Sequence, residues 1–395
     1  MISKRFIFLA LLLANIAAFA SPSDSVMFRV EIDDKYGFVK ANGEILIEPQ
    51  FDYAGQFSVN GLAKVEINGK YGYIDKTGKI VIEPQFELAL DFHSENGLAP
   101  VTINGKWGFI DKTGKIVVEP QFIDCFYSQG VYNFLRKSVD DDQTGFLEDN
   151  TGKLTIVPYV IMTFFGDGLA AVSTKKGYGY IDLTGEIAIK PNSKYQFISC
   201  HYEGLAAVMP KNKWGKWGFI DKKGKVVIRP IYDHVYRFSN GKTTVVKNDK
   251  CGVINTKGEM IIKPQFDMID KFAANGLAIV KINDKYGYID TTGTIVFEPK
   301  FNKATAFSEN NFACVKTDNK WGIIDNTGKW VMEPQFEGPY PPEFVGNYII
   351  VANYTKKGTY RSDGVIDLTT GKYTIEATCG YKISPAFIDE SEEDL

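Results

Sequence analysis

The sequence predicts an all-β protein made of tandem three-stranded β-meanders, about nine clear copies and a degenerate tenth. Two observations predict this fold class. A Lys-aromatic-Gly motif recurs along the chain with a proline after it, and no stretch of the repeat region keeps a helical period. The chain has 395 residues, of which 44% are hydrophobic and 14% aromatic. This composition supports a sizeable core and argues against general disorder.

The repeat is clearest when residues 70–86 are set beside residues 106–122, because the two segments match almost residue for residue. An anchor glycine recurs at intervals of 34 to 39 residues, and a proline closes the second strand of every unit. A degenerate tenth copy follows at residues 364–371. The anchor glycines are Gly37, Gly72, Gly108, Gly145, Gly179, Gly218, Gly252, Gly287 and Gly322, and the prolines are Pro49, Pro84, Pro120, Pro158, Pro191, Pro230, Pro264, Pro299 and Pro334.

Each part of the unit has a structural interpretation. In the second unit, residues 70–74 read as a strand rich in aromatic and β-branched residues, and residues 75–78, Asp-Lys-Thr-Gly, as a turn. Residues 79–83 return as a second strand, which the proline ends because it cannot donate to a sheet. A Gly-Leu-Ala motif, as at residues 61–63, opens the third strand. A loop phenylalanine recurs between these strands, at Phe57, Phe92, Phe126, Phe197, Phe238, Phe272 and Phe307.

One such meander cannot bury its apolar faces alone, so the units must stack on their neighbours. We expect an open, curved or superhelical array. The alternative is a closed ring like a β-propeller, but propellers usually have four to eight blades of four strands each. Nine or ten units of three strands fit that pattern poorly.

The chain divides into four segments by composition. Residues 1–20 predict a signal peptide, with Lys4 and Arg5 before an apolar run and Ala18-Phe19-Ala20 as the cleavage site; a retained anchor is the alternative. Residues 21–34 form a lead-in, residues 35–375 the repeat array, and residues 376–395 a C-terminal segment with an acidic, disordered tail. We expect an exported protein, periplasmic or secreted, with no membrane span after signal removal.

These motifs resemble the WG (KWG) repeat of bacterial exported proteins, over roughly residues 35 to 375. The resemblance implies an all-β repeat scaffold and no shared catalytic residues. The chain departs from the motif at Thr144 and Cys251, each of which replaces the aromatic residue.

Candidate catalytic or metal-binding groups do not form a recognisable motif, so we expect no enzyme, no cofactor and no metal. The three histidines His93, His201 and His234 lack metal-ligand spacing. The repeated turn carboxylate at Asp75 and its equivalents reads as a turn residue; a ladder of calcium ligands is the alternative. The five cysteines read as buried apolar residues, although bridges between neighbouring repeats remain possible. They are Cys125, Cys200, Cys251, Cys314 and Cys379.

Charge is distributed unevenly along the repeats. Residues 173–263 carry 17 Lys and Arg against 7 Asp and Glu, a net charge of +10, although the whole chain carries −3. The residue before the proline is basic in units five to seven, at Lys190, Arg229 and Lys263. It is acidic in units one to three, eight and nine, at Glu48, Glu83, Glu119, Glu298 and Glu333.

We call Lys190, Arg229 and Lys263 the basic band and predict that it binds a ligand, together with Trp214, an aromatic residue outside the repeat pattern. A solvated face is the alternative for the band. The aromatic before each glycine reads as packing between repeats, with a stacking groove as its alternative. The sequence therefore predicts a non-catalytic exported scaffold that binds a protein or peptide at the cell envelope. The alternative is a binder of anionic cell-wall or surface glycan, and no nucleic acid is expected.

Overall fold

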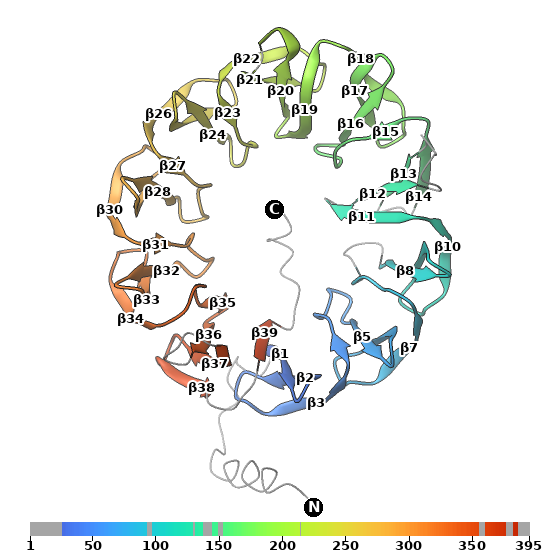
Figure 1. Ribbon diagram of the computed structural model, residues 1–395, viewed down its shortest axis with the longest axis vertical. Coiled ribbons are helices and arrows are strands. Elements are labelled where there is room, and N and C mark those ends of the chain that lie inside the picture. Colours follow the sequence, from blue (N-terminus) through green and yellow to red (C-terminus); the bar gives the residue numbers. More distant parts are fainter. Residues whose placement is uncertain are drawn as a thin grey trace, which may run out of the picture.

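Ten small antiparallel sheets stand around a closed ring (Figure 1). The computed structural model describes residues 26–92, 97–128, 131–136, 144–148, 153–213, 215–354, 360–376 and 382–385. The prediction of an all-β fold of tandem meanders is confirmed. The array closes as a β-propeller, so the alternative holds and the preferred open array does not form. Among the described residues, no helix is long and apolar enough to cross a membrane.

We call each sheet a blade and number the blades along the chain from blade 1, which contains the first strand. The strands nearest the centre are β39 (Lys382–Pro385), β4 (Tyr53–Ala54), β11 (Asp124–Ser128), β15 (Val160–Ile161), β19 (Tyr195–Tyr202), β23 (His234–Val235), β27 (Met268–Ile269), β31 (Lys303–Ala304) and β35 (Glu343–Val345), for blades 1, 2 and 4 to 10. The second strands of blades 1 to 10 are β1 (Met27–Ile32), β5 (Ala63–Ile67), β8 (Ala99–Ile103), β12 (Val131–Arg136), β16 (Leu169–Thr174), β20 (Leu205–Pro210), β24 (Lys242–Lys247), β28 (Ala278–Ile282), β32 (Phe312–Thr317) and β36 (Tyr348–Tyr354).

The third strands are β2 (Lys35–Lys40), β6 (Lys70–Ile74), β9 (Lys106–Ile110), β13 (Thr144–Glu148), β17 (Gly177–Asp182), β21 (Trp217–Asp221), β25 (Lys250–Asn255), β29 (Lys285–Ile289), β33 (Lys320–Asp325) and β37 (Tyr360–Asp367). The outermost strands are β3 (Ile45–Phe51), β7 (Ile80–Phe86), β10 (Ile116–Phe122), β14 (Lys153–Val157), β18 (Ile187–Asn192), β22 (Val226–Tyr232), β26 (Met260–Phe266), β30 (Ile295–Phe301), β34 (Trp330–Phe336) and β38 (Lys372–Ile375). A short 3₁₀ turn, η2 (Lys211–Lys213), follows β20.

A short innermost strand turns the predicted three-stranded unit into a four-stranded blade. In blade 2 this strand is only Tyr53–Ala54, which pairs with Glu66 and Val65 of β5. In blade 3 a single bridge between Ala89 and Val101 takes its place. The sequence did not reveal this strand because two residues show no alternation of apolar and polar side chains. With it, the objection that three-stranded units fit a propeller poorly no longer applies.

The two ends of the chain close the ring in blade 1. Strand β39 pairs with β1, with Val30 opposite Ile383, so the innermost strand comes from the far end of the chain. The Arg29 side chain donates a hydrogen bond from Nε to Ser384 Oγ at 2.9 Å. Val30 and Ile383 belong to one buried cluster with Ile350 of blade 10. The segments 21–34 and 376–395 therefore each contribute a strand to the propeller.

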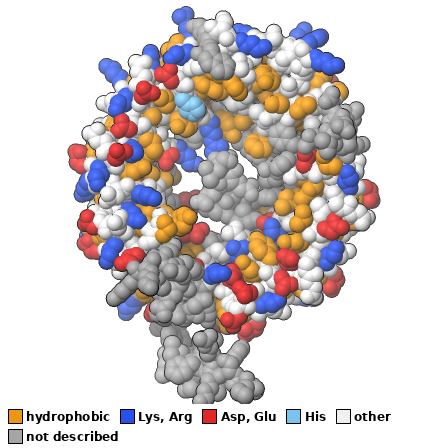
Figure 2. All heavy atoms as spheres, viewed as in Figure 1, with side chains coloured by type: hydrophobic (Ala, Val, Ile, Leu, Met, Phe, Trp, Pro, Cys, Tyr) orange, Lys and Arg blue, Asp and Glu red, His pale blue; other side chains and the backbone are white. Residues whose placement is uncertain are grey.

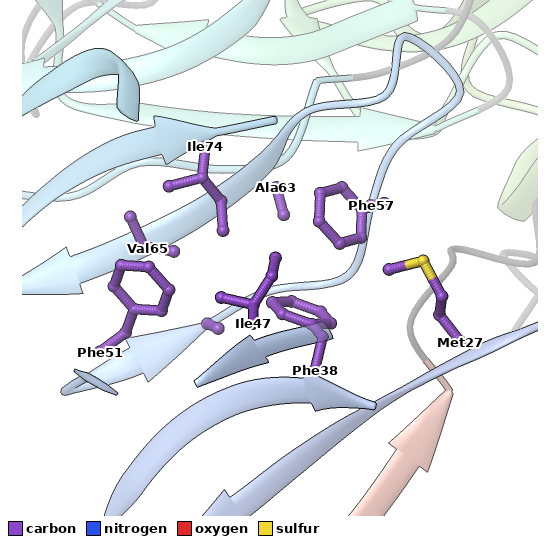
Figure 3. Close-up of a cluster of buried hydrophobic side chains, with 9 residues drawn as sticks. Met27, Phe38, Ile47, Phe51, Phe57, Ala63, Val65 and Ile74 are labelled. Atoms are coloured by element: carbon purple, nitrogen blue, oxygen red, sulfur yellow. The ribbon is translucent and has the colours of Figure 1, made fainter. Parts of the chain in front are cut away.

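The core is divided into clusters that lie between neighbouring blades. Between blades 1 and 2, Phe38 and Ile47 face Phe57, Val65 and Ile74 across the interface (Figure 3). All five side chains are almost completely buried. Similar clusters occupy the other interfaces around the ring. Since each blade buries its faces only against its neighbours, closure of the ring buries the last two exposed faces.

The recurring loop phenylalanine packs on the aromatic residue after the anchor glycine of the preceding blade. The ring centroids of Tyr73 and Phe92 lie 4.7 Å apart, and those of Phe219 and Phe238 lie 4.9 Å apart. In blade 6 the equivalent partner is His201, whose ring lies 4.6 Å from that of Tyr180. The assignment of Phe197 to this set was wrong, because its side chain is 48% exposed. The side chain of Phe126 lies outside the described residues.

His201 is fully buried, and neither of its ring nitrogens has a hydrogen-bond partner. Burial lowers the pKa of the imidazole because the charged form loses its hydration. The histidine therefore occupies an apolar site that phenylalanine fills in other blades.

The anchor glycine lies where the third strand touches the bulged outermost strand. A Cβ atom on Gly218 would lie 2.4 Å from the carbonyl oxygen of Ile228 and 2.7 Å from the nitrogen of Pro230. The register of β21 and β22 shifts at this point, between Trp217 and Phe219. The prediction that the proline ends this strand was wrong: Pro230 lies in the bulge, where no ladder hydrogen bond is required of it, and the strand continues to Tyr232. Glycine is needed here because two backbones approach closely, and the same contact recurs around the ring.

We expect Gly218→Ala to lower the free energy of unfolding by about 3 kcal/mol, since the methyl group meets backbone atoms that cannot move independently. Chemical denaturation of both chains measures the difference. Gly241→Ala is the control: its φ is +74°, but nothing lies within 4 Å of the added methyl. It should cost about 1 kcal/mol. Equal losses in the two variants would contradict the close-contact explanation.

We expect His201→Phe to stabilise the fold and to reduce the loss of stability on acidification. The unfolded chain binds a proton near the ordinary imidazole pKa of about 6.5, whereas the folded chain resists protonation. Stability should therefore fall as the pH drops below that value in the native chain, and less so in the variant. Thermal unfolding between about pH 7 and 5 tests this. An identical pH dependence in both chains would contradict it.

Candidate functional site

The repeated turn carboxylates serve the backbone. Asp111 Oδ1 accepts hydrogen bonds from Thr113 N at 2.8 Å, Thr113 Oγ1 at 2.6 Å and Lys115 N at 3.1 Å. The hydroxyl contact is the main cause of the lowered pKa of this carboxyl. Asn255 accepts the same two backbone bonds in blade 7. Among the described residues, no three His, Cys, Asp or Glu side chains are grouped as a metal site.

The aromatic residue before each anchor glycine packs between blades. Trp321 is buried, and the other members of the set in the described strands are half-buried: Tyr36, Tyr71, Trp107, Tyr178, Trp217 and Tyr286. Tyr36 of blade 1, for example, lies 5.5 Å from Tyr53 of blade 2.

The cysteines in the described part of the chain are free. Cys125, Cys251 and Cys314 are buried, and Cys200 is half-buried. Burial raises the pKa of each thiol, so none of these four side chains is an activated nucleophile. Cys379 lies outside the described residues.

The basic band lies on the outer edge of the ring. Lys190, Arg229 and Lys263 are exposed side chains of β18, β22 and β26, the outermost strands of the consecutive blades 5, 6 and 7. The acidic equivalents occupy the same position in blades 1 to 3, 8 and 9, and are also exposed. Trp214 lies outside the described residues. Its role as a ligand-binding residue is therefore still a prediction.

More lysines lie on the crossover face, the face on which the chain passes from the outermost strand of one blade to the innermost strand of the next. Lys194 lies in such a crossover, and Lys175, Lys176 and Lys211 lie in turns between second and third strands, which reach the same face. All four are exposed. Lys211 N donates to Lys194 O at 3.0 Å, so these two residues are neighbours.

Ion pairs between blades use other lysines of this face. Lys250 of blade 7 contacts Asp267 of blade 8 at 2.5 Å, and Asp267 also accepts a hydrogen bond from Asn283 N. Lys216 and Asp233 form the equivalent pair between blades 6 and 7. These carboxylates therefore bind adjacent blades together.

An aromatic cluster lies where blades 6 and 7 meet, and we call it the inner cluster: Phe197, Trp217, His234 and Tyr236. The rings follow one another, with 6.1 Å between Phe197 and Trp217, 6.4 Å between Trp217 and His234, and 4.9 Å between His234 and Tyr236. Phe197 is 48% exposed and Tyr236 is 51% exposed. Sequence reasoning missed this cluster, because its members come from different parts of two repeats.

Exposed apolar side chains continue along the innermost strand of blade 5. Val160 is exposed there, and Met162 and Phe164 follow in the next loop. In Figure 2, hydrophobic side chains gather on the inner edge of the ring at the top of the view, with Lys and Arg along the rim. The arc of blades 5 to 7 thus combines an apolar inner edge with a basic outer edge.

A cavity of about 120 Å³ lies between blades 5 and 6 within this arc. Its wall includes Tyr178 and Asn192 of blade 5 and Lys194, Tyr195 and Ile198 of blade 6. Ile189 and Ile220 line it as well, so the cavity is a mainly apolar recess beside Lys194 of the crossover face.

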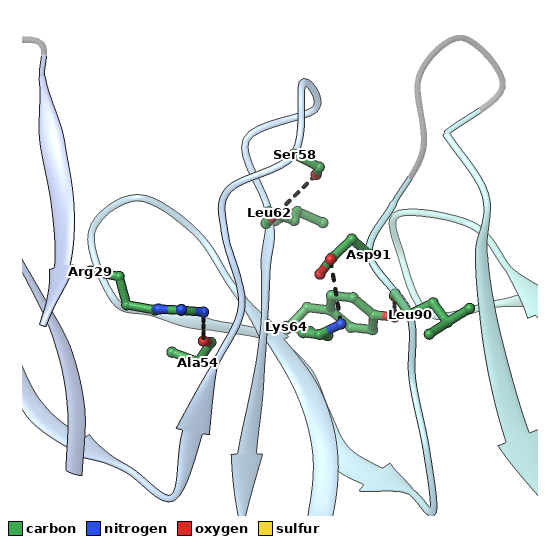
Figure 4. Close-up of polar contacts among 8 residues, drawn as sticks. Arg29, Ala54, Ser58, Leu62, Lys64, Leu90 and Asp91 are labelled. Atoms are coloured by element: carbon green, nitrogen blue, oxygen red, sulfur yellow. Dashed lines mark hydrogen bonds and ion pairs between the residues drawn. The ribbon is translucent and has the colours of Figure 1, made fainter. Parts of the chain in front are cut away.

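The inner edge of blades 1 to 3 is different, because its cations Arg29 and Lys64 have partners in the adjacent blade (Figure 4). Arg29 Nη1 donates to Ala54 O at 2.8 Å, and Lys64 Nζ contacts Asp91 Oδ2 at 3.3 Å. Each contact joins adjacent blades and gives the cation a partner within the protein. This region therefore offers less free charge than the arc of blades 5 to 7.

These features define a propeller-shaped repeat protein, an architecture typical of non-catalytic binding scaffolds. The family model described as "WG containing repeat" matches most of the ring, and the chain belongs to this family. The unmatched stretch between residues 134 and 178 contains Thr144, one of the two departures from the motif. The matched residues are 36–71, 71–107, 107–134, 178–214, 217–251, 252–286, 286–321 and 321–351.

One solved structure supports the fold. The chain is similar to one described as "Crystal structure of the eukaryotic initiation factor", with 12% identity, a TM-score of 0.53, and coverage of 92% of this chain and 99% of that one. It also matches dihydro-heme d1 dehydrogenase NirN in complex with DHE, with 14% identity, a TM-score of 0.40, and coverage of 94% and 77%. BamB from Moraxella catarrhalis matches with 11% identity, a TM-score of 0.34, and coverage of 87% and 94%. No curated protein matches the chain.

We expect Asp111→Asn to keep the thermal stability of the chain, because asparagine accepts the same backbone bonds, as Asn255 does. Asp111→Ala should lower the unfolding midpoint, because the turn amides lose their acceptor. Differential scanning calorimetry with and without calcium measures both. A calcium-dependent midpoint that Asp111→Asn abolishes would contradict the role of this carboxylate as a turn residue.

Proposed function

We propose that this chain is an exported, non-catalytic scaffold that binds a protein or peptide partner at the cell envelope, in the periplasm or after secretion. One observation carries the proposal: exposed aromatic and aliphatic side chains are concentrated on the inner edge of three consecutive blades. Large exposed apolar patches on monomeric proteins mark interaction sites. The propeller supplies a rigid frame that holds them in place.

Export is supported by the N-terminal residues. Lys4 and Arg5, the apolar run after them and the small residues Ala18 and Ala20 have the order of a signal peptide. A partner in that compartment would meet the ring only after cleavage near Ser21.

The second candidate is an anionic glycan bound through the basic band. The observation that favours it is the exposure of Lys190, Arg229 and Lys263 on adjacent outermost strands. A repeating polymer with a negative charge could follow such an edge from blade to blade.

To test the proposal, the full chain with a C-terminal tag is produced in its native cells, which are then fractionated and cross-linked. We expect a processed chain beginning near Ser21 outside the cytoplasm, in a saturable complex with one protein. Purified cell-wall polymer serves as the competitor. Co-sedimentation with that polymer, lost when Lys190, Arg229 and Lys263 are changed to Glu, would support the glycan instead. An unprocessed cytoplasmic chain would contradict export.

A further inference from the structure

We propose that the arc of blades 5 to 7 binds an acidic peptide segment that carries an aromatic side chain. The aromatic ring contacts the inner cluster, and the carboxylates contact Lys194, Lys211 and the basic band. This inference rests on the proposed function and names the chemistry of the partner.

The inner cluster can accept another ring. The plane of His234 is inclined by 77° to that of Trp217, and the plane of Tyr236 by 87° to that of His234. Such edge-to-face arrangements leave ring edges and faces for a further aromatic group. About half of the surface of Phe197 and Tyr236 is exposed, so a ligand ring would bury apolar area there.

Trp217 packs between blades 6 and 7, but the exposed members of the cluster, Phe197 and Tyr236, lie outside that packing. Phe197 is paired across the sheet with Met209, and Tyr180 uses His201 rather than Phe197 as its packing partner. Phe197 and His234 occupy equivalent positions in their innermost strands. Met268 in blade 8 and Lys303 in blade 9 occupy the same position in theirs. Exposed rings at this position are therefore not a requirement of the repeat.

Two cations lie near the cluster on the crossover face, and one of them, Lys194, lies on the side of blade 6 that faces blade 5. The pairing of Phe197 with Met209 and of Tyr195 with Pro210 places Lys194 and Lys211 within three residues of Phe197, about 10 Å along the strand. Both lysines are exposed and have no carboxylate partner in the described part of the chain. They can therefore pair with carboxylates of a ligand.

The basic band is within reach of the same ligand. Three strand spacings separate the innermost from the outermost strand of a blade, about 14 Å. An extended peptide covers that distance in about five residues. A segment with acidic residues on either side of one aromatic side chain therefore fits between the inner cluster and Arg229 or Lys263.

The innermost strand of blade 6 favours a peptide over a glycan. Strand β19 has eight residues, whereas β15 and β23 have two each. Among the described strands, β19 pairs only with β20, which leaves its other edge towards the centre of the ring (Figure 1). The backbone groups of a strand edge are best matched by another polypeptide backbone.

The test is fluorescence anisotropy of the purified full chain with a labelled peptide of about twelve residues, made of Asp, Glu and Ser with one central Phe. We expect saturable binding that weakens with added salt. The same peptide with Ser in place of Phe, and a version with amides in place of carboxylates, should each bind at least tenfold more weakly.

Variants of the chain locate the site. Phe197→Ser with Tyr236→Ser, and separately Lys194→Glu with Lys211→Glu, should each weaken binding at least tenfold. The controls Val59→Ser and Lys112→Glu change exposed side chains of the same kind on other blades and should bind as the native chain does. Circular dichroism and unfolding midpoints confirm that every variant is folded.

Several outcomes would overturn the inference. Binding that is unchanged in both double variants would place the peptide elsewhere, although a protein partner found in cells would leave the proposed function intact. Failure of the native chain to bind the peptide, or binding of polygalacturonate at a lower carboxylate concentration than the peptide requires, would reject an acidic peptide as the ligand. Tighter binding of the peptide after removal of residues 386–395 would mean that the acidic end of this chain, and not a separate peptide, is the ligand of the arc.

Discussion

The fold depends on one constraint, which is that no blade can bury its apolar faces by itself. Phe38 and Ile47 of blade 1 are shielded only because Phe57 and Val65 of blade 2 cover them. An open array would leave such faces exposed at both ends. In this chain β39 pairs with β1, and the same closure buries Val30 and Ile383 against Ile350. The closed ring therefore follows from the same packing that joins every pair of blades.

This constraint separates the residues that build the ring from those that are free to act. The packing positions between blades repeat closely, with the anchor glycine, the turn carboxylate and the loop aromatic in the same places. The edges of the blades carry no such requirement, since their side chains meet solvent on the rim or at the centre. Differences between repeats therefore accumulate there. In blades 5 to 7 they produce the inner cluster and the basic band within one arc.

The repeat pattern predicted much of the local structure correctly, because its signals lie within a few residues of one another. The hairpin around Asp111 and the burial of Cys125, Cys251 and Cys314 follow from such signals. The prediction that the proline ends the second strand was wrong, because a bulge lets the strand continue past it. The interpretation of Phe197 as a packing residue failed, because the longer strand β19 shifts that role to His201. The inner cluster was missed for a related reason, since Phe197 and His234 are neighbours only after blades 6 and 7 pack together.

The sequence alone determined the repeat unit, the all-β class and the grouping of basic residues in units five to seven, because each can be read from residues close together in the chain. The tertiary structure decided whether the array closes, since closure requires the first and last strands to pair across the length of the chain. It also decided which of the residues that differ between repeats lie together on one surface. The basic outer edge and the apolar inner edge of blades 5 to 7 lie at opposite ends of the same sheets, and only the radial order of the strands places them there.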